Sequence, residues 1–382
     1  MKILYVLNSA KYGGMEYHVG DLVLGMKRKG YSVFVWCPSG EMAEEYKRSG
    51  ATVTEEIIKK DIDNGYISKL RNFINENEID IVHAHELKAV TNALKACEGT
   101  KAKIITHTHT PISEWQINPL KRFLNTKFYS YVVNKYSDME VALTESKKKV
   151  KIKEGIKEDK LCVIPNGLDT SKLTMSSMQR SDYSKEIKSR HNIPDGAFVF
   201  GNLGRITKEK GHDVLVKAFK KFLDTHMFRR DMFYLLIVGG GSLEARVKDL
   251  SKQLDIEKNV IVTGRFADED KIKYFSAFDV FLFPTLAEGF GLVLIESMFL
   301  GIPTICSDLE VLKEVAGEHA EFFEVSNSDN LADKMSDVYN KMDHGGNTKA
   351  DEAKEYVEKT FSLEKFIENY EILYKSVLGD IK

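Results

Sequence analysis

Short apolar runs alternate with amphipathic stretches along the whole chain. Most runs are continuous stretches of Val, Ile, Leu and Phe, which is typical of parallel strands covered by helices on both faces. The first half contains Ile3–Leu7, Ser32–Cys37, Asp80–His85, Lys103–His109, Glu140–Thr144 and Leu161–Pro165. The second half contains Phe198–Leu203, Tyr234–Gly239, Val260–Gly264, Val280–Pro284 and Pro303–Ser307. The pattern predicts an α/β fold with parallel sheets.

The segments between these runs have helical spacing. Examples are Tyr17, Leu22 and Met26, and then Val214, Leu215, Ala218 and Phe222. Repeated strand–helix–strand units build doubly wound sheets, which bind ligands at the carboxyl ends of their strands. We therefore expect Rossmann-like domains that face a ligand-binding cleft.

The chain is too long for one ordinary core, because it has 382 residues. A polar, Ser-rich stretch near Gly167–Asp195 predicts a flexible joint between two domains. We expect an N-terminal domain over residues 1–170 and a C-terminal domain over residues 171–362. Helical periodicity returns from Ser362 to Leu378, and a helix over about 363–382 can pack on either half.

The net charge of −2 argues against nucleic acid as an obligatory partner. Residues 1–170 hold 26 Lys and Arg against 22 Asp and Glu, a net of +4, so the remainder has −6. A basic N-terminal half suits an anionic acceptor or lipid surface, and scatter of surface charge explains it equally well.

Four scattered cysteines indicate a reducing compartment without a zinc ribbon. The apolar start is too short for a secretory signal and predicts a buried strand. The longest apolar stretch, Phe290–Cys306, is interrupted by Glu296 and Ser297, so we expect no membrane span. A cytoplasmic protein is expected, with contact at the inner face of the membrane left open.

Candidate chemistry follows the ends of three predicted strands. The segment G-N-L-G-R-I-T-K-E-K-G places Arg205 and Lys210 beside a helix start, which suits a diphosphate. The segment E-G-F-G-L-V-L-I-E places Glu288 on a loop and Glu296 on an otherwise apolar helix. Ribose hydroxyls would satisfy such a carboxylate, and a structural salt bridge is the alternative. Gly13 and Gly14 follow the first strand, where a plain strand-to-helix turn is the simpler interpretation.

Two glutamates separated by seven residues resemble the E-x7-E motif of retaining glycosyltransferases of family 4, which have the GT-B fold. Five further segments resemble that family's motifs in the same order. They are G-G-M-E at 13–16, V-I-P-N-G-L-D at 163–169, G-R-I-T-K-E-K-G at 204–211, and the turns L-I-V-G-G-G at 236–241 and V-T-G-R-F at 262–266. The resemblance covers nearly the whole chain.

The resemblance implies roles for individual residues. Arg205 and Lys210 would neutralise the donor diphosphate, Glu296 would hold the ribose, and Glu288 would face the donor sugar. Further donor contacts would come from Gly13, Gly14, Gly239, Arg265, Phe266, Gly289, Phe290, Gly291 and Leu292. The family also has a histidine near the transferred sugar. Here K-I-I-T-H-T-H-T-P offers two, of which we prefer His109, with His107 as the alternative.

Other motifs suggest metals or membranes. His83, His85, His107 and His109 could build a four-histidine metal site, but strand-end histidines often line clefts without metal, so we expect none. D-I-D at 61–63 and D-E-D at 268–270 resemble the D-x-D of GT-A enzymes. The first has no strand immediately before it and helix capping explains the second, so we expect a metal at neither. The basic segments at 119–131 and 146–153 could rest on an anionic membrane or form solvated helix faces.

The resemblance thus implies a metal-independent enzyme that moves a hexose or N-acetylhexosamine from a nucleotide sugar without a cofactor. UDP-sugars are favoured and GDP-mannose comes next, with a glycan or lipid-linked acceptor in surface polysaccharide or glycoconjugate synthesis. The alternative is an inactive nucleotide-binding partner protein. An NAD-dependent oxidoreductase ranks lower, because neither half has G-x-G-x-x-G after its first strand.

Overall fold

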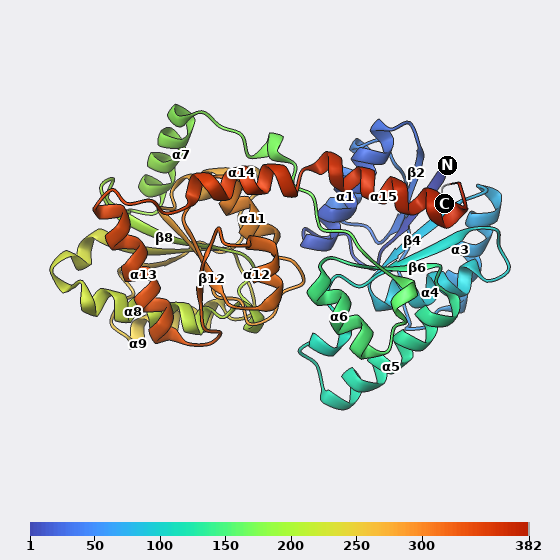
Figure 1. Ribbon diagram of the computed structural model, residues 1–382, viewed down its shortest axis with the longest axis horizontal. Helices are drawn as coiled ribbons and strands as arrows, with labels where there is room; N and C mark the ends of the chain where they lie inside the picture. The colour runs from blue at the N-terminus through green and yellow to red at the C-terminus, as the bar shows by residue number, and fades with distance from the viewer. Residues whose placement is uncertain (381–382) are drawn as a thin grey trace. The chain divides into compact units, whose positions relative to one another are not determined.

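The computed structural model describes residues 1–380, which form two compact units. Unit 1 comprises Met1–Gly167 and the chain from Phe361 onward, and unit 2 comprises Leu168–Thr360. Each unit contains one sheet in which every strand pairs in parallel, with helices around it (Figure 1). The predicted fold class, two Rossmann-like doubly wound α/β domains, is confirmed.

The sheet of unit 1 has seven strands in the order β3-β2-β1-β4-β5-β6-β7. The chain winds outward from β1 in one direction and then from β4 in the other, so the order reverses between these two central strands. The bounds of the seven strands are β1 Lys2–Val6, β2 Ser32–Cys37, β3 Thr52–Glu55, β4 Ile81–His85, β5 Lys103–His107, β6 Met139–Ala142 and β7 Leu161–Val163.

The sheet of unit 2 has six strands in the order β10-β9-β8-β11-β12-β13, which is the same winding. The order reverses between β8 and β11, and such a reversal is where open α/β sheets bind ligands. The bounds are β8 Phe198–Leu203, β9 Phe233–Val238, β10 Val260–Val262, β11 Val280–Phe283, β12 Thr304–Ser307 and β13 Glu321–Phe323.

Helices connect the strands in both units. The α-helices are α1 Gly14–Arg28, α2 Glu41–Arg48, α3 Asn64–Glu76, α4 Leu87–Cys97, α5 Pro119–Tyr136, α6 Glu145–Glu154, α7 Ser177–Arg190, α8 His212–Thr225, α9 Glu244–Gln253, α10 Lys271–Ser276, α11 Leu292–Phe299, α12 Glu310–Ala316, α13 Ser328–Asp343, α14 Ala350–Thr360 and α15 Leu363–Leu378. Short 3-10 helices are η1 Ile112–Glu114, η2 Glu158–Lys160, η3 Thr170–Lys172, η4 Lys208–Lys210, η5 Met227–Met232 and η6 Asp268–Asp270.

Two edge strands, β3 and β13, have no counterpart in the sequence analysis. Each pairs with only one neighbour, and their residues are mostly half-buried or exposed. A strand that is not covered on both faces needs no continuous apolar run. T-V-T-E and E-F-F therefore lack the signal by which the central strands were recognised.

The segment predicted to be a flexible joint contains a helix, α7. Its start carries a capping box, in which the Ser176 hydroxyl accepts from the Gln179 amide and the Gln179 side chain accepts from the Ser176 amide. Within α7 only Ile187 and Lys188 are buried, so the helix lacks the apolar stripe that predicts helices from sequence.

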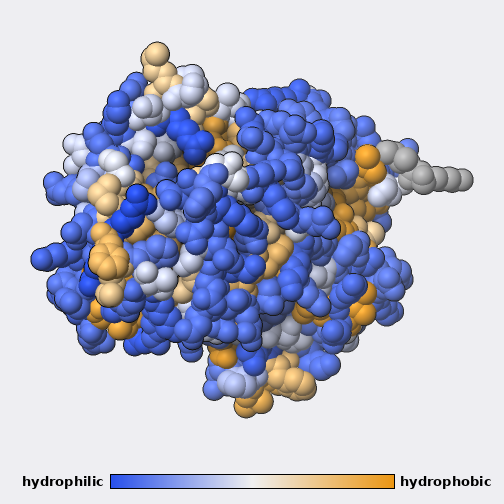
Figure 2. All heavy atoms as spheres, turned by 60° about the vertical axis from the view of Figure 1, so that its left-hand side comes forward, coloured by the Kyte–Doolittle hydropathy of each residue, from blue (hydrophilic) through white to orange (hydrophobic). Residues whose placement is uncertain are grey.

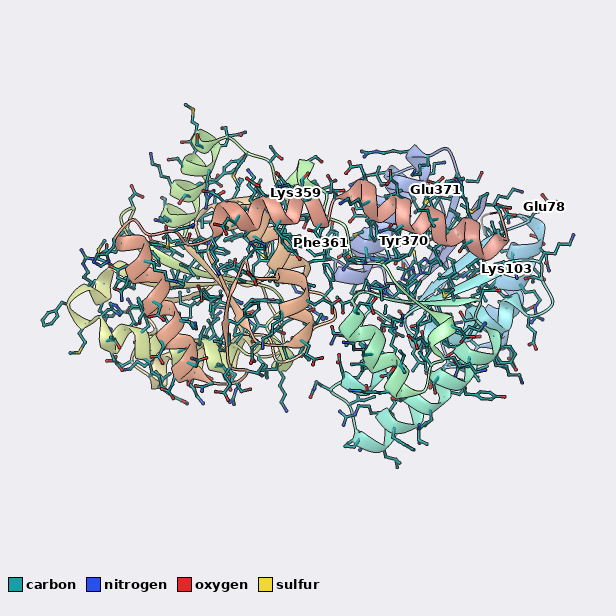
Figure 3. All side chains as sticks on the ribbon, viewed as in Figure 1. Glu78, Lys103, Lys359, Phe361, Tyr370 and Glu371 are labelled. Atoms are coloured by element: carbon teal, nitrogen blue, oxygen red, sulfur yellow. The ribbon has the colours of Figure 1, made fainter. Side chains whose placement is uncertain are left out.

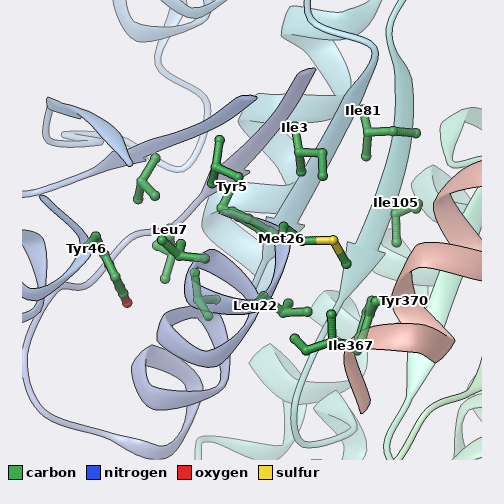
Figure 4. Packing of buried hydrophobic residues seen from close by; sticks show 14 of the residues in the cluster. Ile3, Tyr5, Leu7, Leu22, Met26, Tyr46, Ile81, Ile105, Ile367 and Tyr370 are labelled. Carbon is green, nitrogen blue, oxygen red and sulfur yellow. The ribbon is translucent and has the colours of Figure 1, made fainter. Parts of the chain in front are cut away.

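The core of unit 1 places the C-terminal helix α15 against α1 and the strands behind it. Ile367 and Tyr370 of α15 belong to one buried cluster with Leu22 and Met26 of α1 and Tyr5 of β1 (Figure 4). The chain thus returns to unit 1 after completing unit 2, as Figure 1 shows.

Hydrophilic residues dominate the face seen in Figure 2, and hydrophobic ones form small groups between them. Among the helices of residues 1–380, none combines the length and apolar composition that a membrane crossing requires.

Candidate active site

Three glycine-rich turns meet at the carboxyl end of the sheet of unit 2. Gly239 has φ +134°, and a Cβ there would lie 2.0 Å from the Gly204 carbonyl oxygen. A Cβ on Gly241 would lie 2.2 Å from the Ile206 carbonyl oxygen. The Ile206 amide donates to the Gly240 carbonyl at 3.0 Å. Only glycines allow this close backbone contact, which holds both neighbours of Arg205.

Arg205 itself is exposed and has no hydrogen-bond or ion-pair partner among the described residues. It lies between the two backbone positions that the glycine turns fix. Arg265, which follows β10, is also exposed, and its Cγ would meet a Cβ on Gly240 at 2.9 Å. Two cationic side chains therefore project from neighbouring turns, and Phe266 beside them packs on Tyr274 at 5.5 Å between ring centroids.

Lys210 and Glu288 are in direct contact, although 78 residues separate them. The Lys210 Nζ donates to Glu288 Oε2 at 2.6 Å and lies 5.5 Å from the centre of the Phe283 ring. Gly211 makes this contact possible, because it has φ +68° and a Cβ there would lie 2.0 Å from the Pro284 carbonyl oxygen. A side chain at 211 would push η4 away from the end of β11.

The loop that carries Glu288 is tied to η4 by further bonds. The Leu286 amide and the Thr285 hydroxyl donate to the Glu209 carbonyl at 2.7 and 3.0 Å. After the loop, Gly291 at φ +97° precedes the first turn of α11. Gly289 and Phe290 are buried and Leu292 is half-buried, so this segment offers mainly backbone groups at the start of α11.

Glu296 on α11 is 8 % exposed, and its two oxygens have different surroundings. Oε1 accepts from the Lys271 ammonium at 2.5 Å. Oε2 is buried and has no hydrogen-bond partner in the described part of the chain. Burial raises the pKa of this carboxyl group, and the Lys271 charge opposes that rise. The salt bridge considered from the sequence exists, and the second oxygen is buried without a partner among the described residues.

Gly13 and Gly14 of unit 1 begin the first turn of α1. The structure places an acid of the same turn there, because a Cβ on Gly13 would lie 2.5 Å from Glu16 Oε2. Glu16 is itself buried. A carboxylate at a helix start uses the positive end of the helix dipole, so this turn already holds one negative group.

Five histidines of unit 1 lie close together. His83 and His85 come from β4, His107 ends β5, His109 follows it, and His18 comes from α1. Neighbouring rings are 4.0 to 6.0 Å apart between centroids, for instance 4.0 Å for His107 and His109 and 4.8 Å for His18 and His109. Burial lowers the pKa of His18 to about 4, and it lowers the pKa of each of the other four well below the ordinary value.

The two candidate sugar-facing histidines differ in exposure. His107 is fully buried, whereas His109 is partly exposed. The His109 backbone amide donates to Glu86 Oε1 at 3.2 Å. Burial raises the pKa of the Glu86 carboxyl group to about 7, and Glu86 takes a left-handed backbone at φ +70°.

A buried ion pair supports the segment between these two histidines. Lys151 Nζ donates to the Thr108 carbonyl at 2.9 Å and forms an ion pair with Glu140, which accepts from the Tyr129 hydroxyl at 2.9 Å. Lys151 and Glu140 are 1 % and 0 % exposed, so these bonds replace water completely. The network fixes the backbone at Thr108.

The two aspartate pairs have structural tasks. The Asp63 side chain accepts from the Tyr66 amide at 3.2 Å and so caps α3. Asp268 and Asp270 belong to η6, and Asp270 binds Arg190 at 2.8 Å. Neither pair belongs to a group of three or more potential metal ligands in residues 1–380.

The structure brings Lys210 together with Glu288, and Arg205 together with the glycine turns that also contact Arg265. Gly13, Gly14, His107 and His109 belong to unit 1. Three residues with chemical relevance were missed: Lys271, His18 and Asn166. His18 lies in G-G-M-E-Y-H, so its place one helical turn after Gly14 was a usable signal, whereas nothing local marks Lys271 as the partner of Glu296.

Two known family models match this chain, one after the other along the sequence. The family model described as Glycosyltransferase Family 4 matches residues 12–172, and the one described as Glycosyl transferases group 1 matches residues 184–360. The two matches thus cover most of the chain in the order of its two sheets.

Curated relatives are similar over parts of their length. An uncharacterized glycosyltransferase of Methanocaldococcus jannaschii is 25% identical over 63% of this chain and 58% of its own. The O-antigen biosynthesis glycosyltransferase WclY of Escherichia coli is 29% identical over 46% of this chain and 45% of its own. The mannosylfructose-phosphate synthase of Agrobacterium fabrum is 24% identical over 78% of this chain and 72% of its own. The chain therefore spans about half the length of the first two relatives.

Solved structures share the whole fold. HepE of Anabaena, solved with UDP and glucose, superposes with a TM-score of 0.85 at 18% identity, covering 98% of this chain and 100% of its own. Sucrose-phosphate synthase of Thermosynechococcus elongatus has a TM-score of 0.80 at 15% identity, covering 100% of both chains. At these identities the likeness establishes the GT-B fold alone.

Proposed function

The chain belongs to the family 4, group 1 glycosyltransferases, and we propose that it transfers a hexose or N-acetylhexosamine from a nucleoside-diphosphate sugar to a glycan or lipid-linked acceptor. The proposed donor is a UDP-sugar, with GDP-mannose second. Support comes from HepE, which was solved with UDP and glucose, and from relatives such as WclY, an O-antigen biosynthesis enzyme. The proposed pathway is therefore the synthesis of a surface polysaccharide or glycoconjugate.

The observation that carries this proposal is the contact of Lys210 with Glu288 at the carboxyl end of the sheet of unit 2, where Arg205 follows β8. Arg205 is an exposed cation that makes no described hydrogen bond or salt bridge. Lys210 has three N–H donors, so it can bind Glu288 and a phosphate oxygen together. We propose that both cations bind the diphosphate and that Glu288 accepts from hydroxyl groups of the donor sugar.

The remaining donor contacts follow from the same loops. We propose that Glu296 Oε2 accepts from the ribose, since this buried oxygen otherwise has no described partner. The base would contact Arg265 and Phe266. Backbone contacts are proposed for Gly239, Gly289, Phe290, Gly291 and Leu292, and a phosphate or acceptor contact for Gly13 and Gly14.

The reaction we propose breaks the bond between the anomeric carbon and the diphosphate oxygen and forms one to an acceptor oxygen. Arg205 and Lys210 stabilise the charge that develops on the leaving diphosphate. The acceptor oxygen attacks on the face from which the diphosphate leaves, so the configuration is retained. A diphosphate oxygen takes the proton of the acceptor hydroxyl, and no metal is needed at the diphosphate. His109 is the preferred sugar-facing histidine, because His107 is fully buried.

The test is the double variant Arg205→Ala, Lys210→Ala, assayed for transfer from UDP-sugars. Each charge-assisted contact contributes about 1.5–3 kcal/mol, so the loss of both should lower transfer by about 100- to 10,000-fold. Lys208→Ala is the matched control, because Lys208 is an exposed cation of the same loop. A folded double variant with near-wild-type turnover would overturn the proposal. Wild-type protein that binds UDP without transfer to any acceptor would instead favour an inactive partner protein.

We further propose that α5 contacts an anionic membrane surface that presents the acceptor. Its outer face exposes large apolar side chains at helical spacing: Leu120 68%, Phe123 58%, Leu124 56%, Phe128 40% and Tyr131 58%. Lys121, Lys127 and Lys135 are exposed along the same helix. Apolar side chains flanked by lysines suit the interface of an anionic bilayer.

Vesicle sedimentation tests this surface. The wild-type chain should bind phosphatidylglycerol vesicles more strongly than phosphatidylcholine vesicles, and Phe123→Ser with Leu124→Ser should remove most of that binding. Ile372→Ser serves as control, because Ile372 is 55% exposed on another helix. Equal binding to both lipids, or binding unchanged by the double substitution, would exclude this role of α5.

A further inference from the structure

Four of the five buried histidines converge on one point in unit 1. We call them the histidine cluster: His18, His85, His107 and His109. One ring nitrogen from each lies within 4.8 Å of the others. The closest described pair, His85 Nδ1 and His109 Nε2, is 3.2 Å apart. Two nitrogens on a tetrahedral zinc ion lie about 3.3 Å apart, given bonds of about 2.0–2.1 Å. For tetrahedral binding the longest pair would have to close by about 1.5 Å.

Three ring nitrogens of the cluster are buried without a partner among the described residues, whereas His85 Nδ1 and His109 Nε2 contact each other and both nitrogens of His18 have a contact. Neither nitrogen of His107 has a hydrogen-bond partner within residues 1–380, and His85 Nε2 has none either. A neutral imidazole always carries one N–H and one lone pair, so His107 leaves both groups unsatisfied. Buried polar groups without partners are rare in native proteins, and an ion is one of the recognised explanations.

We propose that the histidine cluster binds one transition-metal ion, with Zn²⁺ as the first candidate and Cu²⁺, Ni²⁺ or Co²⁺ as chemical equivalents. Imidazole nitrogens suit these ions, whereas the cluster offers no carboxylate set for Mg²⁺ or Ca²⁺. The sequence considered His83 in place of His18. The structure assigns the fourth place to His18, because His83 Nδ1 contacts the Tyr374 hydroxyl at 2.9 Å and His83 lies outside the converging group.

His18 has the second contact that a metal-binding histidine normally has. Its Nδ1 lies 2.6 Å from Asn166 Oδ1, so Nδ1–H donates and the lone pair is on Nε2. Such an outer contact sets the tautomer and orientation of a ligand ring. The Tyr370 hydroxyl contacts the same Nε2 at 3.3 Å, which is long for this bond, and would turn away when a metal binds.

A metal ion in the cluster is compatible with the proposed sugar-facing role of His109, and the metal-site proposal does not depend on that role. His109 Nε2 is directed toward His85, and Nδ1 has no hydrogen-bond partner among the described residues. An ion on Nε2 would leave Nδ1–H as a fixed donor on a partly exposed ring. Charge balance would come from Glu86, whose Oε1 already accepts from the His109 amide.

The experiment is a titration of the full-length, chelator-treated protein with Co²⁺, followed by Zn²⁺. Tetrahedral Co²⁺ absorbs visible light far more strongly than aqueous Co²⁺, and Zn²⁺ should bleach that spectrum. We expect one equivalent of each metal by elemental analysis and a rise in the thermal unfolding temperature on loading. These readouts need no donor or acceptor, so they stay informative if the proposed transferase activity is wrong.

Variants decide which histidines bind. His18→Gln and His85→Asn should each weaken Co²⁺ binding by at least about 10-fold, and Asn166→Ala by about 10–100-fold. His83→Asn, a buried ring beside the cluster, should retain the spectrum. The proposal is overturned if the wild-type protein binds no stoichiometric Co²⁺ at micromolar concentration. It is also overturned if His18→Gln binds like wild type while His83→Asn does not. Since the wild-type titration decides the first point, an unfolded variant leaves the test valid.

Discussion

At the scale of the residue, the two oxygens of Glu296 have different surroundings, and we propose that one serves the fold and the other the ligand. Lys271 satisfies one oxygen and leaves the other buried without a described partner. A carboxylate held this way is oriented before any ligand arrives. It is placed to accept hydrogen bonds, and that preorganisation reduces the cost of binding.

Glu296→Gln keeps the size of the side chain and removes its charge. We expect UDP to bind about 10–100-fold more weakly, because hydrogen bonds to a charged group contribute about 1.5–3 kcal/mol. Isothermal titration calorimetry measures this directly. Glu257→Gln, an exposed acid of the same unit, should bind UDP normally. Unchanged UDP affinity together with impaired transfer would refute the ribose assignment.

At the scale of the element, the contact between α1 and α15 depends on a missing side chain. A Cβ on Gly25 of α1 would lie 2.2 Å from Ile367 Cδ1 and 2.3 Å from its Cγ1. Ile367 is 4 % exposed and packed in the core, so it has no room to withdraw. The glycine therefore lets the two helices approach closely enough to bury the aromatic face of α15.

Gly25→Ala should lower the free energy of unfolding by about 1–3 kcal/mol through overpacking. Hydrogen exchange of the α15 amides should report it first, because that helix is displaced. The matched control is Gly20→Ala in the same helix, where the new Cβ would meet Met42 Cε at an ordinary 3.5 Å. There we expect a gain of about 0.5–1 kcal/mol. Equal effects of both substitutions would show that the close approach has no role.

The same helix is held on its outer side by Glu371, which follows the buried Tyr370 (Figure 3). Glu371 binds the ammonium groups of Lys29 at 2.5 Å and Lys375 at 2.7 Å, and accepts from the Tyr31 hydroxyl at 2.5 Å. These groups lower the pKa of the Glu371 carboxyl from 4.5 to about 2, and Lys29 makes the largest contribution.

A lowered pKa means that the stabilisation is complete above about pH 4.5 and is lost as the pH falls toward 2. Glu371→Gln should therefore cost about 1–3 kcal/mol at pH 7 and little at pH 2. The comparison is the protection of α15 amides at the two pH values. Glu368→Gln, an exposed neighbour, should show no such difference. A cost that is the same at both pH values would mean that Glu371 acts through packing rather than charge.

At the scale of the whole molecule, two sheets with the same winding carry different chemistry at their strand ends. Unit 2 presents the exposed Arg205 and the Lys210–Glu288 pair, whereas unit 1 presents buried neutral histidines and a helix start that already holds Glu16. An anionic diphosphate is attracted to the first of these surroundings.

Hydrogen exchange with and without UDP tests whether unit 2 makes the main contacts with the diphosphate. Protection should increase in residues 203–211 and 284–296 of unit 2, with little change in residues 13–18 of unit 1. Addition of uridine, which lacks phosphates, should protect residues 264–266 without residues 204–210. Stronger protection at residues 13–18 than at 203–211 would show that Gly13 and Gly14, and not unit 2, make the main phosphate contact.

The sequence alone determined the α/β class, the central strands and the family. Each of these depends on local patterns: continuous apolar runs mark strands buried on both faces, and glycines with charged residues at strand ends form recognisable motifs. The sequence analysis did not predict the edge strands β3 and β13 or the helix α7, because partly exposed elements need no apolar pattern.

Only the tertiary structure decided which distant side chains meet. The sequence marked Lys210, Glu288 and Glu296 as one chemical set, but folding pairs Lys210 with Glu288 and gives Glu296 to Lys271. It also put His18, rather than His83, among the converging histidines. These outcomes depend on strand order and on how α1 packs over the sheet. Both arise from long-range burial, which a linear pattern of residues does not encode.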